Sequence, residues 1–252
     1  MTSGGQEAAS AAPRSVLLAW LQLLRLPNLF TVPGDALAGF LFAGGVPSLR
    51  LAAVAAAGLC LYGLGLVLND LADIETDRRE RPGRPLPSGR IPRSHAVLAA
   101  VLLLVGGLGA ARMAGDEPFR LSLLLMAVVV AYNQGLKKDP LGGPLALGAC
   151  RAMNAMLGVA LAQPGIWPAA AWLPPAVIGL YILGVSALAR RETEPGAKFG
   201  PRVIGLAIGL LLPIQAAFCA LSGAGSAGWI CAGVLVMLWP AHVLLGRKIH
   251  AS

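Results

Sequence analysis

The sequence predicts an all-α integral membrane protein, a bundle of about eight transmembrane helices. Of the 252 residues, 56% are hydrophobic and 13% are charged, so the chain lacks the polar surface that covers a soluble core. Apolar runs rich in Ala, Leu, Gly and Val recur from end to end, and roughly 20 such residues cross a hydrocarbon layer about 30 Å thick. Lipid offers free backbone groups no hydrogen-bond partners, so these runs are expected to be helical.

The apolar runs predict eight spans and one membrane domain. We expect the spans near residues 28–44, 51–69, 95–112, 119–136, 142–162, 169–189, 203–222 and 226–245. The segment before the first span, Leu17 to Leu26, has the spacing of an interfacial lead-in helix. Residues 1–14 carry no compact apolar stretch with a cleavage site, which predicts a disordered cytosolic tail. Residues 15–252 then form the transmembrane domain.

The basic residues lie in alternate connections between the runs. One side holds Arg14, Arg25, the six arginines of the 70–94 connection, Lys137, Lys138, Arg190, Arg191, Lys198, Arg202, Arg247 and Lys248, and the other holds Arg50, Arg112 and Arg120. Because cytosolic loops are enriched in Lys and Arg, this asymmetry places both termini and the 70–94 loop in the cytosol, as in a bacterial inner-membrane protein. The +8 charge forms no basic stripe with aromatics, so we expect no nucleic-acid partner.

The connection after the second span carries the most informative polar residues. On one continuous helix Asn69, Asp70, Asp73 and Asp77 share an arc of roughly 100°. Carboxylates on one face repel one another and lose solvation near a membrane, so a positive partner is expected. Asp and Asn oxygens suit a hard ion such as Mg²⁺. The alternative is a solvated helix end with neighbouring arginines as ion-pair partners.

A stiff, proline-limited turn follows the acidic residues. It reads Arg84-Pro-Leu-Pro-Ser-Gly-Arg90 and is expected to hold two guanidinium groups near the acidic face. Carboxylates that bind a metal, next to arginines that donate two hydrogen bonds each, provide what a metal-bridged diphosphate needs.

These residues resemble a known family. The pattern Asn69-Asp70-x-x-Asp73-x-x-x-Asp77, followed by Arg84-Pro-Leu-Pro-Ser-Gly, looks like the first signature of the UbiA superfamily of intramembrane prenyltransferases. The resemblance extends to Arg25 and Asn28, to Tyr132 and Lys137, and to residues 148–151. It implies a helical bundle around a central cavity that opens to lipid, with Mg²⁺ as cofactor and an isoprenoid diphosphate as substrate.

The resemblance also implies roles for individual residues. Asn69, Asp73 and Asp77 would bind Mg²⁺, Asp70 would lie beside them, and the three aspartates would serve catalysis. Arg25, Tyr132, Lys137 and Arg151 would contact the diphosphate. Beside this carry-over, we also expect the following residues to bind substrate: Asn28, Arg84, Arg90, Arg190 and Arg191. Metal and cations would stabilise the leaving diphosphate, and a water-poor cavity would protect the allylic cation until an acceptor traps it.

The sequence departs from the family after the sixth span. The family has a second Asp-rich motif there, whereas residues 186–196 contain no aspartate. Arg190 and Arg191 replace the second ion, or Glu192 and Glu194 bind it in altered geometry, or ionisation is impaired. With eight spans, the chain is similar to a divergent branch that includes the EboC-type UbiA-like proteins.

Several other polar residues have two interpretations. Asp35 and Arg151 lie inside spans, where they form a structural ion pair or serve the site, Arg151 as a diphosphate contact and Asp35 as a base or acceptor-orienting group. Tyr132 is an interfacial anchor or a ligand contact. The echo between Arg25-x-x-Asn28 and Arg151-x-x-Asn154 marks two pseudo-repeated four-helix halves or is chance.

The function expected from this resemblance is Mg²⁺-dependent transfer of a prenyl group from an allylic polyprenyl diphosphate to a lipid-soluble acceptor. The missing second motif motivates an alternative, in which the protein binds or transports an isoprenoid diphosphate or prenylated intermediate without cleaving it. Phosphatidyl transfer is disfavoured because the Asp-Gly-x-x-Ala-Arg spacing is absent.

Overall fold

The computed structural model describes residues 16–191 and 200–249, and within these ranges the regular structure is entirely helical. The α-helices are α1 (Val16–Leu23), α2 (Leu26–Leu29), α3 (Val32–Phe42), α4 (Leu49–Ala72), α5 (Ile74–Glu80), α6 (Arg93–Ala114), α7 (Asp116–Gln134), α8 (Gly142–Ala162), α9 (Leu173–Arg191), α10 (Pro201–Gly209), α11 (Leu211–Leu221) and α12 (Ser226–Ile249). Two short 3-10 helices are η1 (Leu136–Lys138) and η2 (Ala169–Trp172). The predicted all-α class is confirmed.

Six helical segments of the described residues are long and apolar enough to cross a membrane. They are Leu49–Ala72, Arg93–Ala114, Gly142–Ala162, Ala169–Arg191, Arg202–Leu221 and Ser226–Arg247. The number becomes seven when α1 and the α2–α3 segment, which meet at an angle of 55°, are counted as one bent span. The protein is thus an integral multi-pass membrane protein, and the count of eight spans stays a prediction. Charged residues in the first turns of α7, among them Asp116 and Glu117, make that helix less apolar.

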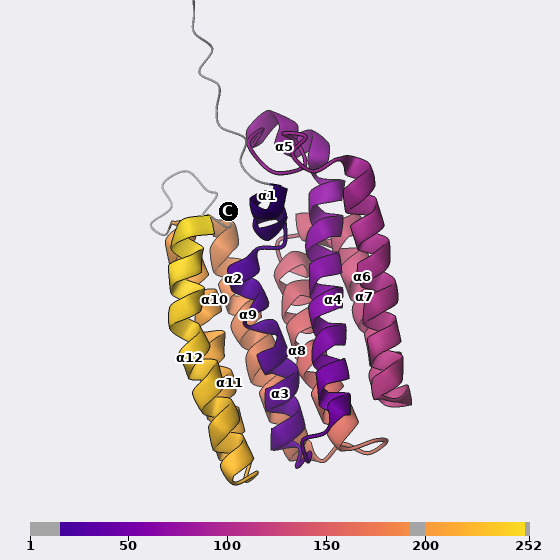
Figure 1. Ribbon diagram of the computed structural model, residues 1–252, viewed down its shortest axis with the longest axis vertical. Coiled ribbons are helices and arrows are strands. Elements are labelled where there is room, and N and C mark those ends of the chain that lie inside the picture. The colour runs from indigo at the N-terminus through magenta and orange to yellow at the C-terminus, as the bar shows by residue number, and fades with distance from the viewer. Residues whose placement is uncertain (1–15, 192–199, 250–252) are drawn as a thin grey trace, which may run out of the picture.

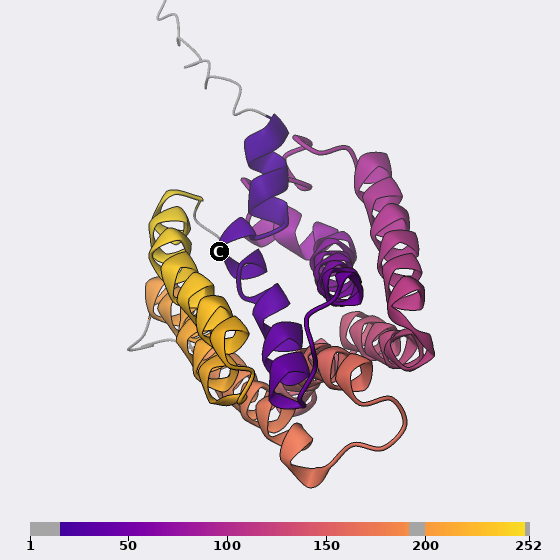
Figure 2. The same ribbon diagram turned by 60° about the horizontal axis from the view of Figure 1, so that its bottom comes forward.

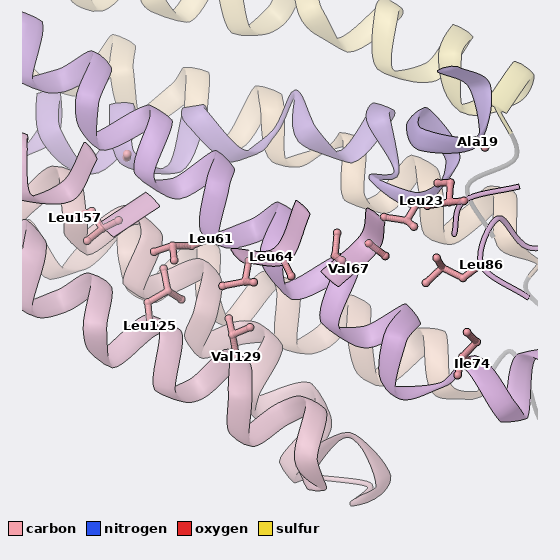
Figure 3. Packing of buried hydrophobic residues seen from close by; sticks show 14 of the residues in the cluster. Ala19, Leu23, Leu61, Leu64, Val67, Ile74, Leu86, Leu125, Val129 and Leu157 are labelled. Atoms are coloured by element: carbon pink, nitrogen blue, oxygen red, sulfur yellow. The ribbon is translucent and has the colours of Figure 1, made fainter. Parts of the chain in front are cut away.

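The long helices run side by side along the bundle (Figure 1). Helices α10, α11 and α12 form one flank, α6 and α7 form the other, and α3, α4 and α8 lie between them, as the turned view also shows (Figure 2). One buried cluster joins α1, α4, α6 and α7 through side chains such as Leu61, Leu64 and Val129 (Figure 3). A second cluster joins α3, α8, α9, α11 and α12.

Small residues bring α3 and α8 into backbone contact. A Cβ atom added at Gly158 would lie 1.9 Å from the carbonyl oxygen of Ala36, and one added at Gly39 would lie 2.2 Å from that of Ala155. Such close approach is how helices associate in lipid, where no hydrophobic effect drives them together. Gly39 and Gly158 thus allow α3 to pack directly against α8 in the middle of the bundle.

Candidate functional site

The acidic residues lie where α4 ends and α5 crosses that end of the bundle, next to α1 (Figure 1). The expectation that one continuous helix carries Asn69 through Asp77 is wrong, because α4 stops at Ala72 and the chain turns at Asp73. Asp70 and Asp77 are buried, Asp73 is partly exposed, and Glu80 is exposed. The turn, rather than a single helix face, therefore sets how the carboxylates are arranged.

Asn69 and Asp73 share one cation. The ammonium group of Lys137, in η1 after α7, lies 2.5 Å from Asp73 Oδ1 and 3.4 Å from Asn69 Oδ1. The side chains of Lys137 and Asp73 retain 14% and 31% of their exposure. Two of the predicted metal ligands therefore point at one position, which the tip of a lysine now occupies.

Asp77 pairs with the proline-limited turn, as the sequence predicts. Arg84 Nη1 donates to Asp77 Oδ2 at 2.8 Å, and both side chains are largely buried. Arg90 donates to the side chain of Gln22 in α1 at 2.9 Å and to the carbonyl oxygen of Gly83 at 2.7 Å. The turn thus binds the acidic segment through Arg84 and the lead-in helix through Arg90.

Arg25 and Tyr132 belong to the same neighbourhood. Arg25 joins α1 to α2 with φ of 47°, a left-handed conformation that costs a non-glycine residue of order 1 kcal/mol or more. Its charge lies within electrostatic range of Asp70 and of the Tyr132 hydroxyl, which is also in range of Asp73 and Arg190. Residues distant in sequence therefore meet at the end of the bundle.

The acidic residues and Asn69 suit a divalent cation, although in this structure the side chains of Lys137 and Arg84 are bound to them. Within the described part of the chain, no three His, Cys, Asp or Glu side chains are already gathered as a metal cluster. Asn69 and Asp73 nevertheless direct oxygens at the single ammonium of Lys137, and oxygen donors are those that Mg²⁺ prefers. Asp77 faces Arg84 instead, so its part as a third ligand stays a prediction.

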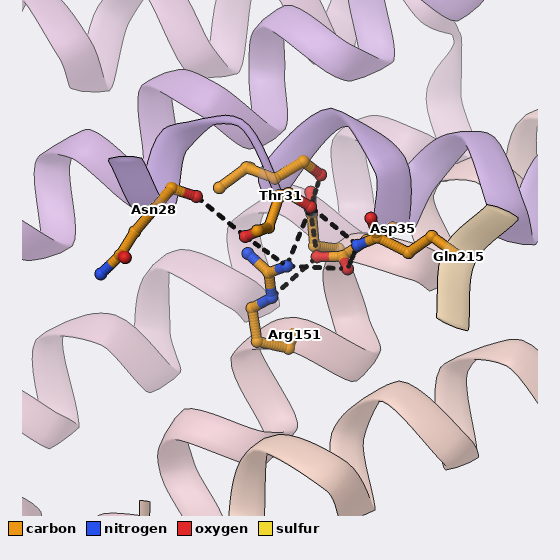
Figure 4. Close-up of polar contacts among 7 residues, drawn as sticks. Asn28, Thr31, Asp35, Arg151 and Gln215 are labelled. Atoms are coloured by element: carbon orange, nitrogen blue, oxygen red, sulfur yellow. Dashed lines mark hydrogen bonds and ion pairs between the residues drawn. The ribbon is translucent and has the colours of Figure 1, made fainter. Parts of the chain in front are cut away.

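Arg151 lies in a buried polar network. Its guanidinium pairs with Asp35 at 2.9 Å and donates to the carbonyl oxygen of Thr31, also at 2.9 Å (Figure 4). Asn154 and Gln215 donate their amide hydrogens to the same carboxylate at 2.9 and 2.7 Å. The ion pair considered from the sequence is present, whereas a diphosphate contact through Arg151 stays a prediction.

The same network fixes the break between α2 and α3. Thr31 Oγ1 donates to the carbonyl oxygen of Asn28 at 2.8 Å, and the Asn28 side chain points away from Arg151 (Figure 4). Asn154 and Gln215 also donate to the backbone carbonyls of Val32 and Thr31. The carbonyl groups at the break thus have partners within the protein, as lipid requires.

Arg190 ends α9 beside the turn that carries Lys137. Its guanidinium donates to the backbone carbonyl oxygens of Lys137 at 2.9 Å, Asp139 at 2.9 Å and Lys138 at 3.2 Å. Arg191 closes the helix and is exposed. Glu192 and Glu194, the alternative second-metal ligands, lie outside the described residues.

Sequence reasoning missed two polar residues. Gln215, fully buried in α11, contacts Asp35, and His242 in α12 lies 2.8 Å from the carbonyl oxygen of Pro27. Each is a polar residue within an apolar run, which is the one sequence signal that could have singled it out.

The comparisons with known proteins agree with this fold. Residues 34–247 match the model of the UbiA prenyltransferase family. The chain is 34% identical over 132 residues to the digeranylgeranylglyceryl phosphate synthase of Methanoculleus marisnigri, covering 51% of this chain and 46% of the relative. It is 29% identical over 168 residues to that of Sulfurisphaera tokodaii, covering 66% and 60%. The alignments thus span about half the length of these relatives.

Solved structures show the same fold at low identity. A UbiA homologue from Aeropyrum pernix superposes with a TM-score of 0.58 at 18% identity, covering 89% of this chain and 92% of that one. A UbiA homologue from Archaeoglobus fulgidus bound to DMAPP and Mg²⁺ gives 0.56 at 15% identity, covering 91% and 87%. The family match over most of the sequence and the shared architecture lead to one conclusion: this chain belongs to the UbiA prenyltransferase family.

Proposed function

We propose that the protein is an intramembrane prenyltransferase, which moves an isoprenoid group from an allylic polyprenyl diphosphate to a lipid-soluble acceptor with the help of Mg²⁺. The observation that carries the proposal is the pairing of acidic and basic side chains at one end of the bundle. Lys137 contacts Asn69 and Asp73. Arg84 pairs with Asp77, and Arg25 lies within electrostatic range of Asp70. Oxygen ligands beside guanidinium and ammonium groups are the chemistry that a metal-bridged diphosphate requires.

Asn69 and Asp73, with Asp77 as the predicted third ligand, would hold Mg²⁺ in this proposal. The bound ion would supply positive charge to the leaving diphosphate. Arg25, Tyr132 and Lys137 would orient the diphosphate and stabilise the charge that develops on it. The apolar helices around the site would keep water from the allylic cation.

The relatives guide the choice of substrates. Their names make digeranylgeranylglyceryl phosphate the first product to seek, and the DMAPP and Mg²⁺ bound to the Archaeoglobus homologue make an allylic diphosphate the first donor. Purified protein incubated with Mg²⁺, geranylgeranyl diphosphate and a glyceryl phosphate lipid should release pyrophosphate, and Asp73→Ala should abolish that release. Wild-type protein that releases none with any donor or acceptor would refute the proposal.

A second candidate is binding or transport of the diphosphate without cleavage. It is favoured by the end of α9, where residues 173–191 contain two arginines and no carboxylate. Tight binding of geranylgeranyl diphosphate without turnover would support this candidate over the enzyme.

We also propose that the 70–94 connection and both termini face the cytosol of a bacterial inner membrane, because the basic residues concentrate on that side. The tail of residues 1–14, the two pseudo-repeated halves and the likeness to EboC-type proteins stay predictions. Arg84, Arg90, Asn28, Arg151, Arg190 and Arg191 stay predicted substrate contacts.

A further inference from the structure

The turn that carries Lys137 is held from behind by Arg190. One guanidinium group donates hydrogen bonds to three successive backbone carbonyl oxygens, those of Lys137, Lys138 and Asp139. Hydrogen bonds from a charged donor are about twice as strong as neutral ones. Arg190 therefore fixes the backbone position from which the Lys137 side chain extends.

The missing side chain of Gly143 makes room for this grip. A Cβ atom added at Gly143, in the first turn of α8, would lie 2.7 Å from Arg190 Nη1, closer than real Cβ contacts come. The nearest atom is the end of a flexible side chain, so the guanidinium group, rather than the backbone, would move. The absence of a side chain at Gly143 thus allows Arg190 to reach the backbone of the Lys137 turn.

The ammonium group of Lys137, which extends from this turn, bridges two side-chain oxygens. Lys137 Nζ lies 2.5 Å from Asp73 Oδ1 and 3.4 Å from Asn69 Oδ1. A single cation between an aspartate and an asparagine oxygen occupies the place that a metal ion bound by both would take. The lysine ammonium group and a divalent ion cannot both bind these two oxygens at the same time.

We infer that Lys137 is a tethered cation that competes with Mg²⁺ for Asn69 and Asp73, and that Arg190 is the positioning residue that keeps it in place. When Asn69 and Asp73 hold the metal, the Lys137 ammonium group would leave their oxygens and would be free to contact a diphosphate. The inference deepens the proposed function and rests on it for the ligand. Without Lys137, the Asp73 carboxylate would lack this counter-ion until a metal arrived.

The test is metal binding without any diphosphate, which needs no turnover. Binding of Mn²⁺ to the full-length protein in nanodiscs is measured by electron paramagnetic resonance, with Mg²⁺ as competitor. We expect Lys137→Met to bind Mn²⁺ about tenfold more tightly than the wild type, the size of effect that follows from losing one partly buried ion-pair competitor. A lysine with a merely structural role would give no gain in affinity.

Two further variants separate position from charge. Arg190→Gln should raise Mn²⁺ affinity in the same direction as Lys137→Met, by a smaller factor. Gly143→Ala should do so as well, although it keeps both positive charges, because it displaces only the guanidinium group. The matched control is Gly184→Ala in α9, where a Cβ atom meets nothing within 4 Å, and its affinity should equal that of the wild type.

The outcomes are decisive in both directions. Unchanged or weaker Mn²⁺ binding by Lys137→Met, or absence of any Mn²⁺ binding that depends on Asp73, overturns the inference. If Mn²⁺ binds as expected and the wild type transfers no prenyl group, the proposed function fails while the competition stands. If prenyl transfer occurs and Lys137→Met shows no gain, the competition fails while the proposed function stands.

Discussion

The buried pair between Asp35 and Arg151 should be the most costly contact in the bundle to break from one side. The Asp35 side chain has no exposure and accepts from Arg151, Asn154 and Gln215 at 2.7–2.9 Å. Asp35→Asn removes the charge and turns an amide donor toward three other donors. Removing one partner of a buried pair costs about 3–5 kcal/mol, since the other charge is left without compensation.

Replacing both charges should cost less than replacing one. In Asp35→Leu/Arg151→Leu no unpaired charge remains in the apolar interior, and an apolar substitute for a buried pair is often near neutral. The free energy of unfolding is measured by circular dichroism in mixed detergent micelles. As a control, Glu117→Gln breaks the exposed pair with Arg120 and should cost less than about 1 kcal/mol. The reasoning is refuted if Asp35→Asn costs no more than this control, or if the double variant costs as much as Asp35→Asn or more.

Two further predictions concern helix contacts and use the same unfolding measurement. Gly158→Ala should destabilise the protein by about 1–3 kcal/mol, because the new methyl group meets the carbonyl oxygen of Ala36; stability equal to that of Gly184→Ala would contradict the close approach. His242→Leu should cost about 1–3 kcal/mol, because both ring nitrogens lie at hydrogen-bond distance from backbone carbonyl oxygens of α2 and α10; an unchanged unfolding midpoint would show that these contacts do not tie the three helices together.

Much of the fold could be predicted from the sequence because the bilayer constrains it so strongly. The span expected at residues 142–162 coincides with α8, and most of the others differ from the observed helices by a few residues. The segments expected as single spans at 28–44 and 203–222 are each divided into two helices. The break at Asp73 could not be predicted, since neither proline nor glycine marks it. The pairing of residues in the turn with the acidic segment was also accessible, because Arg84 follows Asp77 within a stiff loop.

The remaining site contacts depend on packing between distant segments. Gln215 and Asp35 are 180 residues apart in the chain, and Lys137 reaches Asp73 across 64 residues. No local period or spacing encodes such contacts. The sequence identified which polar residues were unusual in an apolar chain, and only the folded bundle shows which of them satisfy one another.

The Asp35–Arg151 and Asp73–Lys137 ion pairs differ in a way that predicts their behaviour. Asp35 and Arg151 keep 0% and 7% of their side-chain exposure, whereas Asp73 and Lys137 keep 31% and 14%. An ion pair without access to water loses much free energy when its partners separate. The Asp35–Arg151 pair is therefore expected to stay closed, whereas the Asp73–Lys137 pair can exchange its lysine for a hydrated ion. We therefore expect millimolar Mg²⁺ to leave the first pair intact and to release Lys137.

Chemical labelling tests the expected release of Lys137, with the neighbouring Lys138 as an internal reference. An amine that shares its hydrogens with two oxygens and is largely covered reacts slowly with a water-soluble acylating reagent, whereas the neighbouring Lys138 is exposed. Mass spectrometry should show that Mg²⁺ raises the acylation of Lys137 relative to Lys138, and that the rise disappears in Asp73→Ala. If Mg²⁺ does not change the acylation of Lys137 relative to Lys138, the Lys137 ammonium group stays on Asp73. The Asp73–Lys137 pair would then be as fixed as the buried Asp35–Arg151 pair.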